Sequence, residues 1–161
     1  MSSYFDHKVI WITGASSGIG EALVKNLAQN SNAKIILSSR KEEQLHLVAG
    51  NAGLSKDRYA VIPLDLQNYK EMPALAAKAS EQFGKIDISI NAVTGNGSLQ
   101  GTMDDATKNG MPVDIFAKKM LHAIEKQKRQ KAIGGKEVMA VYLKRFFPDI
   151  LAKIIRKAKV V

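Results

Sequence analysis

The stretch that decides the fold reads Val9-Ile10-Trp11-Ile12-Thr13-Gly14-Ala15-Ser16-Ser17-Gly18-Ile19-Gly20. It begins with a short apolar run, passes through a glycine-rich turn and opens an amphipathic segment. In that segment the apolar residues recur at helical spacing, and they are Ile19, Ala22, Leu23 and Leu27. A glycine cluster between a strand and a helix favours a bound phosphate, because the first turn of the helix presents unpaired N–H groups and the positive end of its dipole. The alternative is a tight strand–helix turn without a ligand.

The same unit of strand, turn and helix recurs along the first ninety residues. Its later apolar runs are Ile35-Ile36-Leu37, Ala60-Val61-Ile62 and Ile86-Asp87-Ile88. Successive centres at positions 10, 35, 61 and 88 lie 25, 26 and 27 residues apart. Strands that alternate with helices at this pitch form βαβ units, so the pattern predicts an α/β fold, a Rossmann-like parallel sheet with right-handed crossovers.

Two further helices are expected within these units. One carries an apolar stripe formed by Met72, Leu75, Ala76, Ala79 and Phe83. Gly84 follows this stripe and is expected to end the helix as its C-terminal cap. The other helix is weaker, runs from Lys41 to Ala49 and is expected to be broken by Gly50 and Gly53.

The pattern changes after Asn91. Residues 94–111 hold four glycines and little apolar periodicity, which predicts a loop. A helix is expected to begin at Val113, with one apolar side made of Ile115, Phe116, Met120 and Ile124. We therefore divide the chain into βαβ units with the candidate phosphate turn at 1–93, the loop at 94–111, and a basic helical C-terminal segment at 112–161 that packs on the same domain.

The C-terminal segment is strongly basic. Residues 118–161 carry 13 Lys and Arg against 3 Asp and Glu, whereas residues 1–117 carry 11 against 12. The pattern predicts a short strand at Ala132-Ile133 and a basic amphipathic helix from about Val138 to Lys157. Residues 144–159 could lie on an anionic membrane surface, and the plainer interpretation is a solvated basic face packed on its own domain. Nucleic acid is not expected as a partner, because no aromatic platform accompanies the charge.

The composition excludes several classes of protein. The 161 residues are 45% apolar and 24% charged, which is an ordinary globular balance. The absence of cysteine excludes disulfides, thiolate metal sites and a cysteine nucleophile. The three histidines lie far apart in the sequence, so no metal site is expected. Residues 1–7 show no secretory signal and no apolar stretch reaches about 20 residues, the length of a membrane span, so a cytoplasmic protein is expected, peripheral to the membrane if its basic helix binds one.

The turn resembles the cofactor turn of the short-chain dehydrogenase/reductase family. Its glycines follow the order Gly-x-x-x-Gly-x-Gly rather than the commoner Gly-x-Gly-x-x-Gly. The likeness covers residues 8–91 closely, and it includes Leu64-Asp65-Leu66 and Gly84-Lys85-Ile86-Asp87-Ile88. It resumes more weakly near residue 95, and residues 110–161 look like the C-terminal part of one bacterial branch. The resemblance implies a sheet of strand order 3-2-1-4 that binds NAD(H) or NADP(H), with Asp65 and Leu66 lying against the adenine.

The end of the second predicted strand indicates which of the two dinucleotides binds. It reads Ser38-Ser39-Arg40, and no carboxylate stands there to accept hydrogen bonds from a ribose 2′-hydroxyl. The planar guanidinium of Arg40 matches a 2′-phosphate instead. We therefore favour NADP(H) over NAD(H), the alternative being that Arg40 is simply a surface cation at a strand end.

The catalytic pair of the family is not found in this chain. Reductases of the family have a serine, a tyrosine and a lysine four residues after the tyrosine, because the alkoxide formed on hydride transfer needs a proton donor whose pKa a nearby ammonium lowers. The tyrosines of this chain stand at positions 4, 59, 69 and 142, and only Tyr4 is followed at four by a lysine, Lys8. We expect Lys8 to run into the first strand, about 13 Å from Tyr4, which makes the pair a coincidence.

The place of the loss can be located by the same resemblance. Where the family continues its fourth strand as Leu-Ile-Asn-Asn-Ala-Gly, this chain reads Ser89-Ile90-Asn91-Ala92-Val93-Thr94. The resemblance implies an internal deletion near residues 88–91 that removes about three repeat units, on the order of 80 residues. Ser89 stands where a strand buried on both faces would carry an apolar residue. The fourth strand is then an edge of the sheet, or it pairs with Ala132-Ile133.

Three hypotheses about function follow. The first is a short-chain dehydrogenase/reductase homologue that binds NADP(H) and is catalytically impaired. The second is an active NAD(P)-dependent oxidoreductase completed by unrecognised groups or by another chain, for instance in a homo-oligomer. The third is a basic peripheral-membrane or protein-interaction module with a vestigial nucleotide site. No catalytic and no metal-binding residue is assigned, and the candidate cofactor-binding residues are Gly14, Ser16, Ser17, Gly18, Ile19, Gly20, Ser39, Arg40, Asp65, Leu66 and Asn91.

Overall fold

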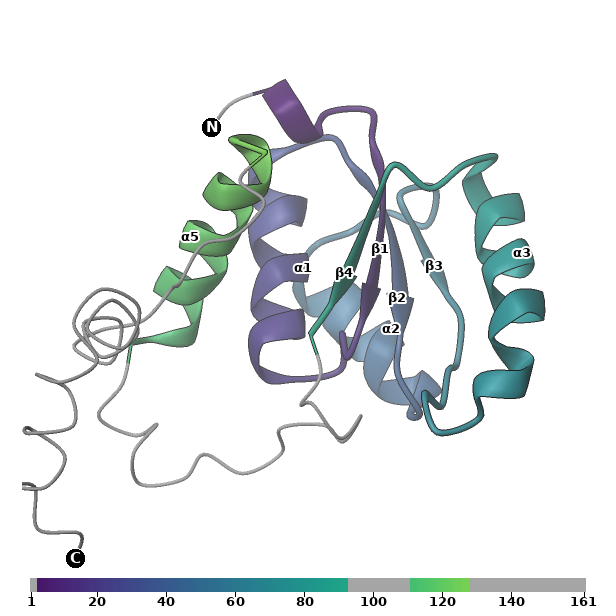
Figure 1. The fold of residues 1–161 in the computed structure, drawn as a ribbon. Coiled ribbons are helices and arrows are strands. Elements are labelled where there is room, and N and C mark those ends of the chain that lie inside the picture. The colour runs from purple at the N-terminus through teal and green to yellow at the C-terminus, as the bar shows by residue number, and fades with distance from the viewer. Residues whose placement is uncertain (1–2, 93–110, 128–161) are drawn as a thin grey trace, which may run out of the picture.

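A parallel four-stranded sheet forms the centre of the molecule. The computed structural model describes residues 3–92 and 111–127. Its strands are β1 (Val9–Thr13), β2 (Lys34–Ser38), β3 (Tyr59–Val61) and β4 (Ile88–Asn91). They lie in the order β3-β2-β1-β4, and every neighbouring pair is parallel (Figure 1). The predicted Rossmann-like sheet and its strand order are therefore confirmed.

Helices cover both faces of this sheet. They are η1 (Ser3–Phe5), α1 (Gly18–Asn30), α2 (Glu42–Asn51), η2 (Tyr69–Glu71), α3 (Met72–Phe83) and α5 (Val113–Glu125). Helices α1 and α2 pack on one face and α3 on the other, while α5 lies beside α1 (Figure 1). The sheet with its two helical layers is the arrangement that alternating βαβ units produce.

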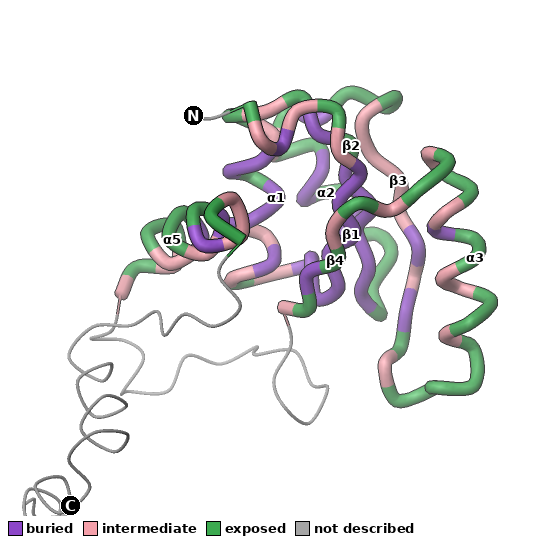
Figure 2. Tube along the Cα trace, turned by 45° about the horizontal axis from the view of Figure 1, so that its top comes forward, coloured by how far each residue is buried: buried purple, intermediate pink, exposed green. Residues whose placement is uncertain are grey.

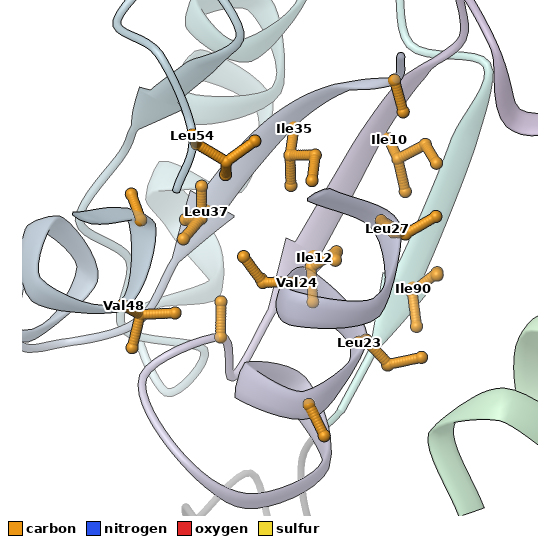
Figure 3. Packing of buried hydrophobic residues seen from close by; sticks show 14 of the residues in the cluster. Ile10, Ile12, Leu23, Val24, Leu27, Ile35, Leu37, Val48, Leu54 and Ile90 are labelled. Atoms are coloured by element: carbon orange, nitrogen blue, oxygen red, sulfur yellow. The ribbon is translucent and has the colours of Figure 1, made fainter. Parts of the chain in front are cut away.

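Two hydrophobic clusters lie on opposite faces of the sheet, and successive residues of β1 and β2 belong alternately to one and the other. On the face of α1 and α2, Ile10, Ile12, Ile35 and Leu37 pack against Leu23, Val24, Leu27 and Val48 (Figure 3). On the face of α3, Val9, Trp11 and Ile36 pack with the buried Ala79. Successive strand residues point to opposite faces, and both faces of β1 are covered, so all five of its residues are buried (Figure 2).

Two predicted helix ends can be compared with the structure. Gly84 adopts φ 79° directly after α3, which confirms it as the left-handed C-terminal cap. The prediction that Gly50 breaks the second helix was wrong, because α2 continues to Asn51 and only Gly53 takes a positive φ, 73°. A glycine inside a helix costs about 1 kcal/mol, and the burial of Val48 and Ala49 next to it outweighs that cost.

Two predictions needed correction further along the chain. The apolar run Ile86-Asp87-Ile88 was expected to be the fourth strand, but β4 begins at Ile88, and Ile86 packs on the α3 side just before it. In α5, Ile115 was placed on the apolar side and is in fact 46% exposed. The buried side of α5 consists of Ala117, Leu121 and Ala123, because residue 115 lies about 200° around the helix from residues 113 and 117. The expected loop up to residue 110, the strand at 132–133 and the helix at 138–157 lie outside the described residues.

Candidate functional site

The carboxyl ends of the four strands lie at the same end of the sheet, because all strands are parallel. Helix α1 begins at this end of the sheet, shortly after β1 (Figure 1). Strand β1 has β2 on one side and β4 on the other, so the chain order reverses at β1. In open α/β sheets ligands bind outside the carboxyl ends of the strands at such a reversal.

Glycines shape the turn between β1 and α1. Gly14 has φ 74° and Gly18 has φ 56°, in the left-handed region that favours glycine. Gly20 is required for a different reason. A Cβ at position 20 would lie 2.7 Å from the carbonyl carbon of Gly14 and 2.9 Å from the Cα of Ala15, and closer still to the carbonyl oxygen of Gly14. The first turn of α1 can therefore lie against the start of the turn only because residue 20 has no side chain.

The first turn of α1 offers free hydrogen-bond donors. Ser17 precedes the helix in an extended conformation, and its side chain makes no capping hydrogen bond. The first amide that bonds to a helix carbonyl belongs to Glu21, which donates to Ser17 O over 3.3 Å. The N–H groups of residues 18–20 thus have no acceptor within the helix. Among the described residues, no atom lies within 4 Å of the place that a Cβ of residue 18 would take. Donors and room for an anion therefore occur together, and the turn fits a dinucleotide diphosphate.

The other candidate residues follow the ends of β2 and β3. Arg40 is exposed and lies two residues beyond the carboxyl end of β2. Ser39 is buried, its carbonyl accepts the amide of Leu64 over 2.9 Å and its hydroxyl accepts the amide of Lys41 over 3.3 Å. Asp65 is exposed, and its Oδ1 accepts the amide of Gln67 over 3.0 Å. The structure thus places Ser39 and Arg40 at the same end of the sheet as the turn, and Asp65 follows the neighbouring strand β3.

Leu66 and Asn91 complete the predicted set in different ways. Leu66 is partly buried and packs on the α3-side cluster, so much of its side chain supports the fold. Asn91 is exposed at the end of β4, where its Oδ1 accepts a 2.8 Å hydrogen bond from Thr13 Oγ1. That bond joins β4 to the last residue before the glycine-rich turn. Gly14 and Ser16 are buried within the turn, and Ser17 and Ile19 are partly exposed.

Sequence reasoning overlooked one residue behind the turn, Ser38. Its carbonyl accepts hydrogen bonds from the amides of Gly14 over 2.8 Å and Ala15 over 3.1 Å. Its hydroxyl accepts a 2.9 Å hydrogen bond from Trp11 Nε1. The only available signal was the polar Ser38-Ser39 pair at the end of an apolar strand, and this signal does not show which serine contacts the turn.

The expected geometry of Tyr4 and Lys8 was wrong. Residues 3–5 form a 3₁₀ helix rather than strand, and β1 begins only at Val9. The chain therefore folds back, and Lys8 Nζ lies 4.9 Å from the centre of the Tyr4 ring as a cation–π contact. Both residues precede β1 and so lie at the amino end of the strands, opposite the glycine-rich turn. Their position separates them from the candidate site.

Two kinds of feature are absent from the described ranges, 3–92 and 111–127. No group of three or more His, Cys, Asp or Glu residues there could hold a metal ion. Within the same ranges, none of the helices has the length and apolar character needed to cross a membrane.

Known proteins match this chain over the region just described. An uncharacterized oxidoreductase of Staphylococcus aureus is 42% identical over 85 residues, which are 53% of this chain and 36% of that protein. The mouse dehydrogenase/reductase SDR family member 7 is 38% identical over 87 residues, 52% of this chain and 25% of that protein. The chain thus matches about a third or less of the length of these curated relatives.

A solved structure and a family model match a longer part. The crystal structure of a short-chain dehydrogenase/reductase from Brucella melitensis is 27% identical with a TM-score of 0.49, covering 66% of this chain and 45% of that chain. The family model described as short chain dehydrogenase matches residues 8–128, which include the whole sheet, the glycine-rich turn and α5. The chain therefore belongs to the short-chain dehydrogenase family.

Proposed function

We propose that this chain binds NADP(H) at the β1–α1 turn and, without another proton donor, does not turn over a substrate. One observation carries the proposal: the turn packs directly against the backbone of α1 at Gly20, and it leaves space for a ligand beside Gly18. The same turn leaves the first amides of α1 without a helix acceptor. A diphosphate bound there would receive these N–H groups and the positive end of the α1 dipole.

The remaining candidate residues would hold the other parts of the dinucleotide. Arg40 is exposed and positively charged, and it would receive the 2′-phosphate that distinguishes NADP from NAD. Ser39 would position Arg40 through its bond to Leu64, and Asp65 with Leu66 would border the adenine. Asn91 would line the site from β4. The bound dinucleotide would supply or accept a hydride.

The impairment follows from the missing Tyr-x-x-x-Lys pair. An alkoxide formed by hydride transfer needs a proton donor close to the reacting carbon. The one tyrosine with a lysine four residues later, Tyr4, precedes β1 and lies at the amino ends of the strands, away from the turn. We also propose that the family's second half-sheet is deleted near residues 88–91. The exposure of Ser89 on β4, where a strand buried on both faces would carry an apolar residue, supports this.

Isothermal titration calorimetry of the full chain tests the binding. NADP⁺ should bind more tightly than NAD⁺, and Arg40→Ala should weaken NADP⁺ binding about tenfold while leaving NAD⁺ unchanged, because only the 2′-phosphate is lost as a partner. Lys78→Ala is the matched control, since it removes one exposed positive charge from α3. Equal affinities for the two dinucleotides, or equal losses in the two variants, would exclude the assignment to Arg40.

A turnover assay tests the impairment. NADPH oxidation is followed by absorbance with panels of aldehydes and ketones, and NADP⁺ reduction with the matching alcohols. The wild-type rate should equal that of a Gly14→Ala/Gly18→Ala variant, whose turn is strained at both left-handed positions. A reproducible excess over this variant would instead support an active oxidoreductase that uses other groups or a second chain.

A further inference from the structure

A buried hydrogen bond lies directly behind the glycine-rich turn. Trp11 Nε1 on β1 donates to Ser38 Oγ at the end of β2 over 2.9 Å. The Ser38 side chain is fully buried and Trp11 is only 7% exposed. An indole N–H that lost this acceptor would have little access to water, so the bond fixes the two side chains relative to each other.

Ser38 also holds the turn through its main chain. Its carbonyl accepts the amides of Gly14 and Ala15, at 2.8 and 3.1 Å. These are the first two residues after β1, and two N–H groups on one carbonyl make their placement depend on that one atom. Ser38 is followed directly by Ser39 and Arg40, so the same residue anchors the turn and the segment with the candidate 2′-phosphate ligand.

We infer that Trp11 and Ser38 are positioning residues for dinucleotide binding: the indole fixes Ser38, and Ser38 fixes the turn. The inference rests on the proposed NADP(H) binding. Both side chains lie in the sheet layer, where Trp11 packs in the cluster under α3, and they act on the ligand through Gly14 and Ala15. A rigid turn keeps its donors in place before the ligand arrives, which strengthens binding by reducing the loss of conformational freedom.

A double-mutant cycle measured by calorimetry with NADP⁺ tests the link. Trp11→Phe removes the N–H donor and keeps an aromatic ring, and Ser38→Ala removes the acceptor. Each substitution should raise the Kd for NADP⁺ about three- to tenfold, the range expected for one hydrogen bond. The Kd of the double variant should be no higher than the higher of the two single-variant values, because both substitutions break the same bond. Leu54→Ala is the control for lost stability, because Leu54 is buried after the end of α2, beside Ile35 and away from the turn (Figure 3), and the Kd of this variant should stay at the wild-type value.

Amide hydrogen exchange followed by NMR gives a readout without ligand. Trp11→Phe and Ser38→Ala should speed exchange at the amides of Gly14 and Ala15 and leave the Ile62 amide, bonded to Leu37 O, unchanged. A wild-type chain that fails to bind NADP⁺ but shows this exchange pattern would overturn the proposed function and keep the mechanical link. Wild-type binding with unchanged Kd in both variants, or with fully additive losses, would overturn the inference about Trp11 and Ser38.

Discussion

Strands β1 and β4 are neighbours in the sheet and differ in how they are covered. Every residue of β1 is buried, whereas β4 alternates between residues packed on the α1 side and exposed residues on the other face. Ile88 and Ile90 belong to the packed set, and Ser89 and Asn91 to the exposed set. The register pairs Trp11 with Ser89, so a polar exposed residue lies beside a buried tryptophan on the same face.

This difference indicates which part of the molecule would hold the proposed dinucleotide. The candidate turn extends from β1 and is anchored to β2, the two strands with helices on both faces. Strand β4 has helical cover on one face among the described residues and contributes only Asn91 to the site. The diphosphate end of a dinucleotide would therefore lie on the well-packed half, and the nicotinamide end would reach towards the less covered half.

The largest difference from a matched variant is expected for Gly20→Ala. Its Cβ would meet backbone atoms of Gly14 and Ala15, which cannot move without displacing the turn, so the variant should lose about 3 kcal/mol of unfolding free energy and its NADP⁺ binding. Gly50→Ala is the same substitution in α2, where no atom of the described part of the chain lies within 4 Å of the new Cβ, and it should gain about 0.5–1 kcal/mol of unfolding free energy. Urea denaturation measures both. Similar unfolding free energies for the two variants would contradict the close packing at Gly20.

The second effect compares paired residues of the two strands. Ile10 and Ile88 are register partners on the same face, and Ile10 is fully buried while Ile88 is partly exposed. Ile10→Ala should cost about 3–4 kcal/mol and Ile88→Ala about 1–2 kcal/mol, because the loss follows the buried area and the cavity that remains. Denaturant unfolding of the two variants gives the difference. Equal losses would show that β4 is as well covered as β1.

Local signals allowed much of this fold to be predicted. The glycine-rich turn, the apolar stripe of α3 and the cap at Gly84 depend on residues close in sequence, and the structure has all three. The start of β4 and the buried side of α5 were missed because they depend on partners elsewhere. Asp87 already donates its amide to Val9 O before the strand begins, and the packing of α5 leaves Ile115 outside.

The candidate site shows the same division. The residues of the turn could be named from the spacing of its glycines, and their role in binding stays a prediction. Ser38 could not be named, because its hydrogen bond with Trp11 joins residues 27 positions apart. Such a pair becomes visible only when the register of β1 and β2 is known.

The third effect separates strain from binding. Gly18→Ala and Gly84→Ala both place a Cβ at a positive φ, 56° and 79°, with no atom of the described residues within 4 Å, so each should cost about 1–2 kcal/mol of stability. Only Gly18 belongs to the turn, so only Gly18→Ala should weaken NADP⁺ binding. Thermal unfolding and calorimetry on the same samples measure the two quantities. A similar loss of affinity in Gly84→Ala would mean that binding follows overall stability.

The smallest effect concerns how β4 is attached to β1. Hydrogen bonds of two side chains join the ends of these strands: Asp87 Oδ2 accepts the Val9 amide over 2.8 Å, and Thr13 Oγ1 donates to Asn91. The Val9 amide, and after it the Lys85 ammonium 3.0 Å away, hold the pKa of Asp87 below its ordinary value of 3.8. The less covered strand thus has polar side-chain contacts at its ends in addition to its ladder and the packing of Ile88 and Ile90.

Because the pKa of Asp87 is lower in the folded chain, its contribution to stability is complete above about pH 5 and is lost as the pH falls through the folded-state pKa. Asp87→Asn should therefore reduce the loss of stability on acidification below pH 4, measured by urea unfolding at a series of pH values. Lys85→Gln should reduce it less, since the Val9 amide remains as the main partner of the carboxylate. An acid profile unchanged in Asp87→Asn, or changed more in Lys85→Gln, would show that β4 is held to β1 by its ladder and by Ile88 and Ile90 alone.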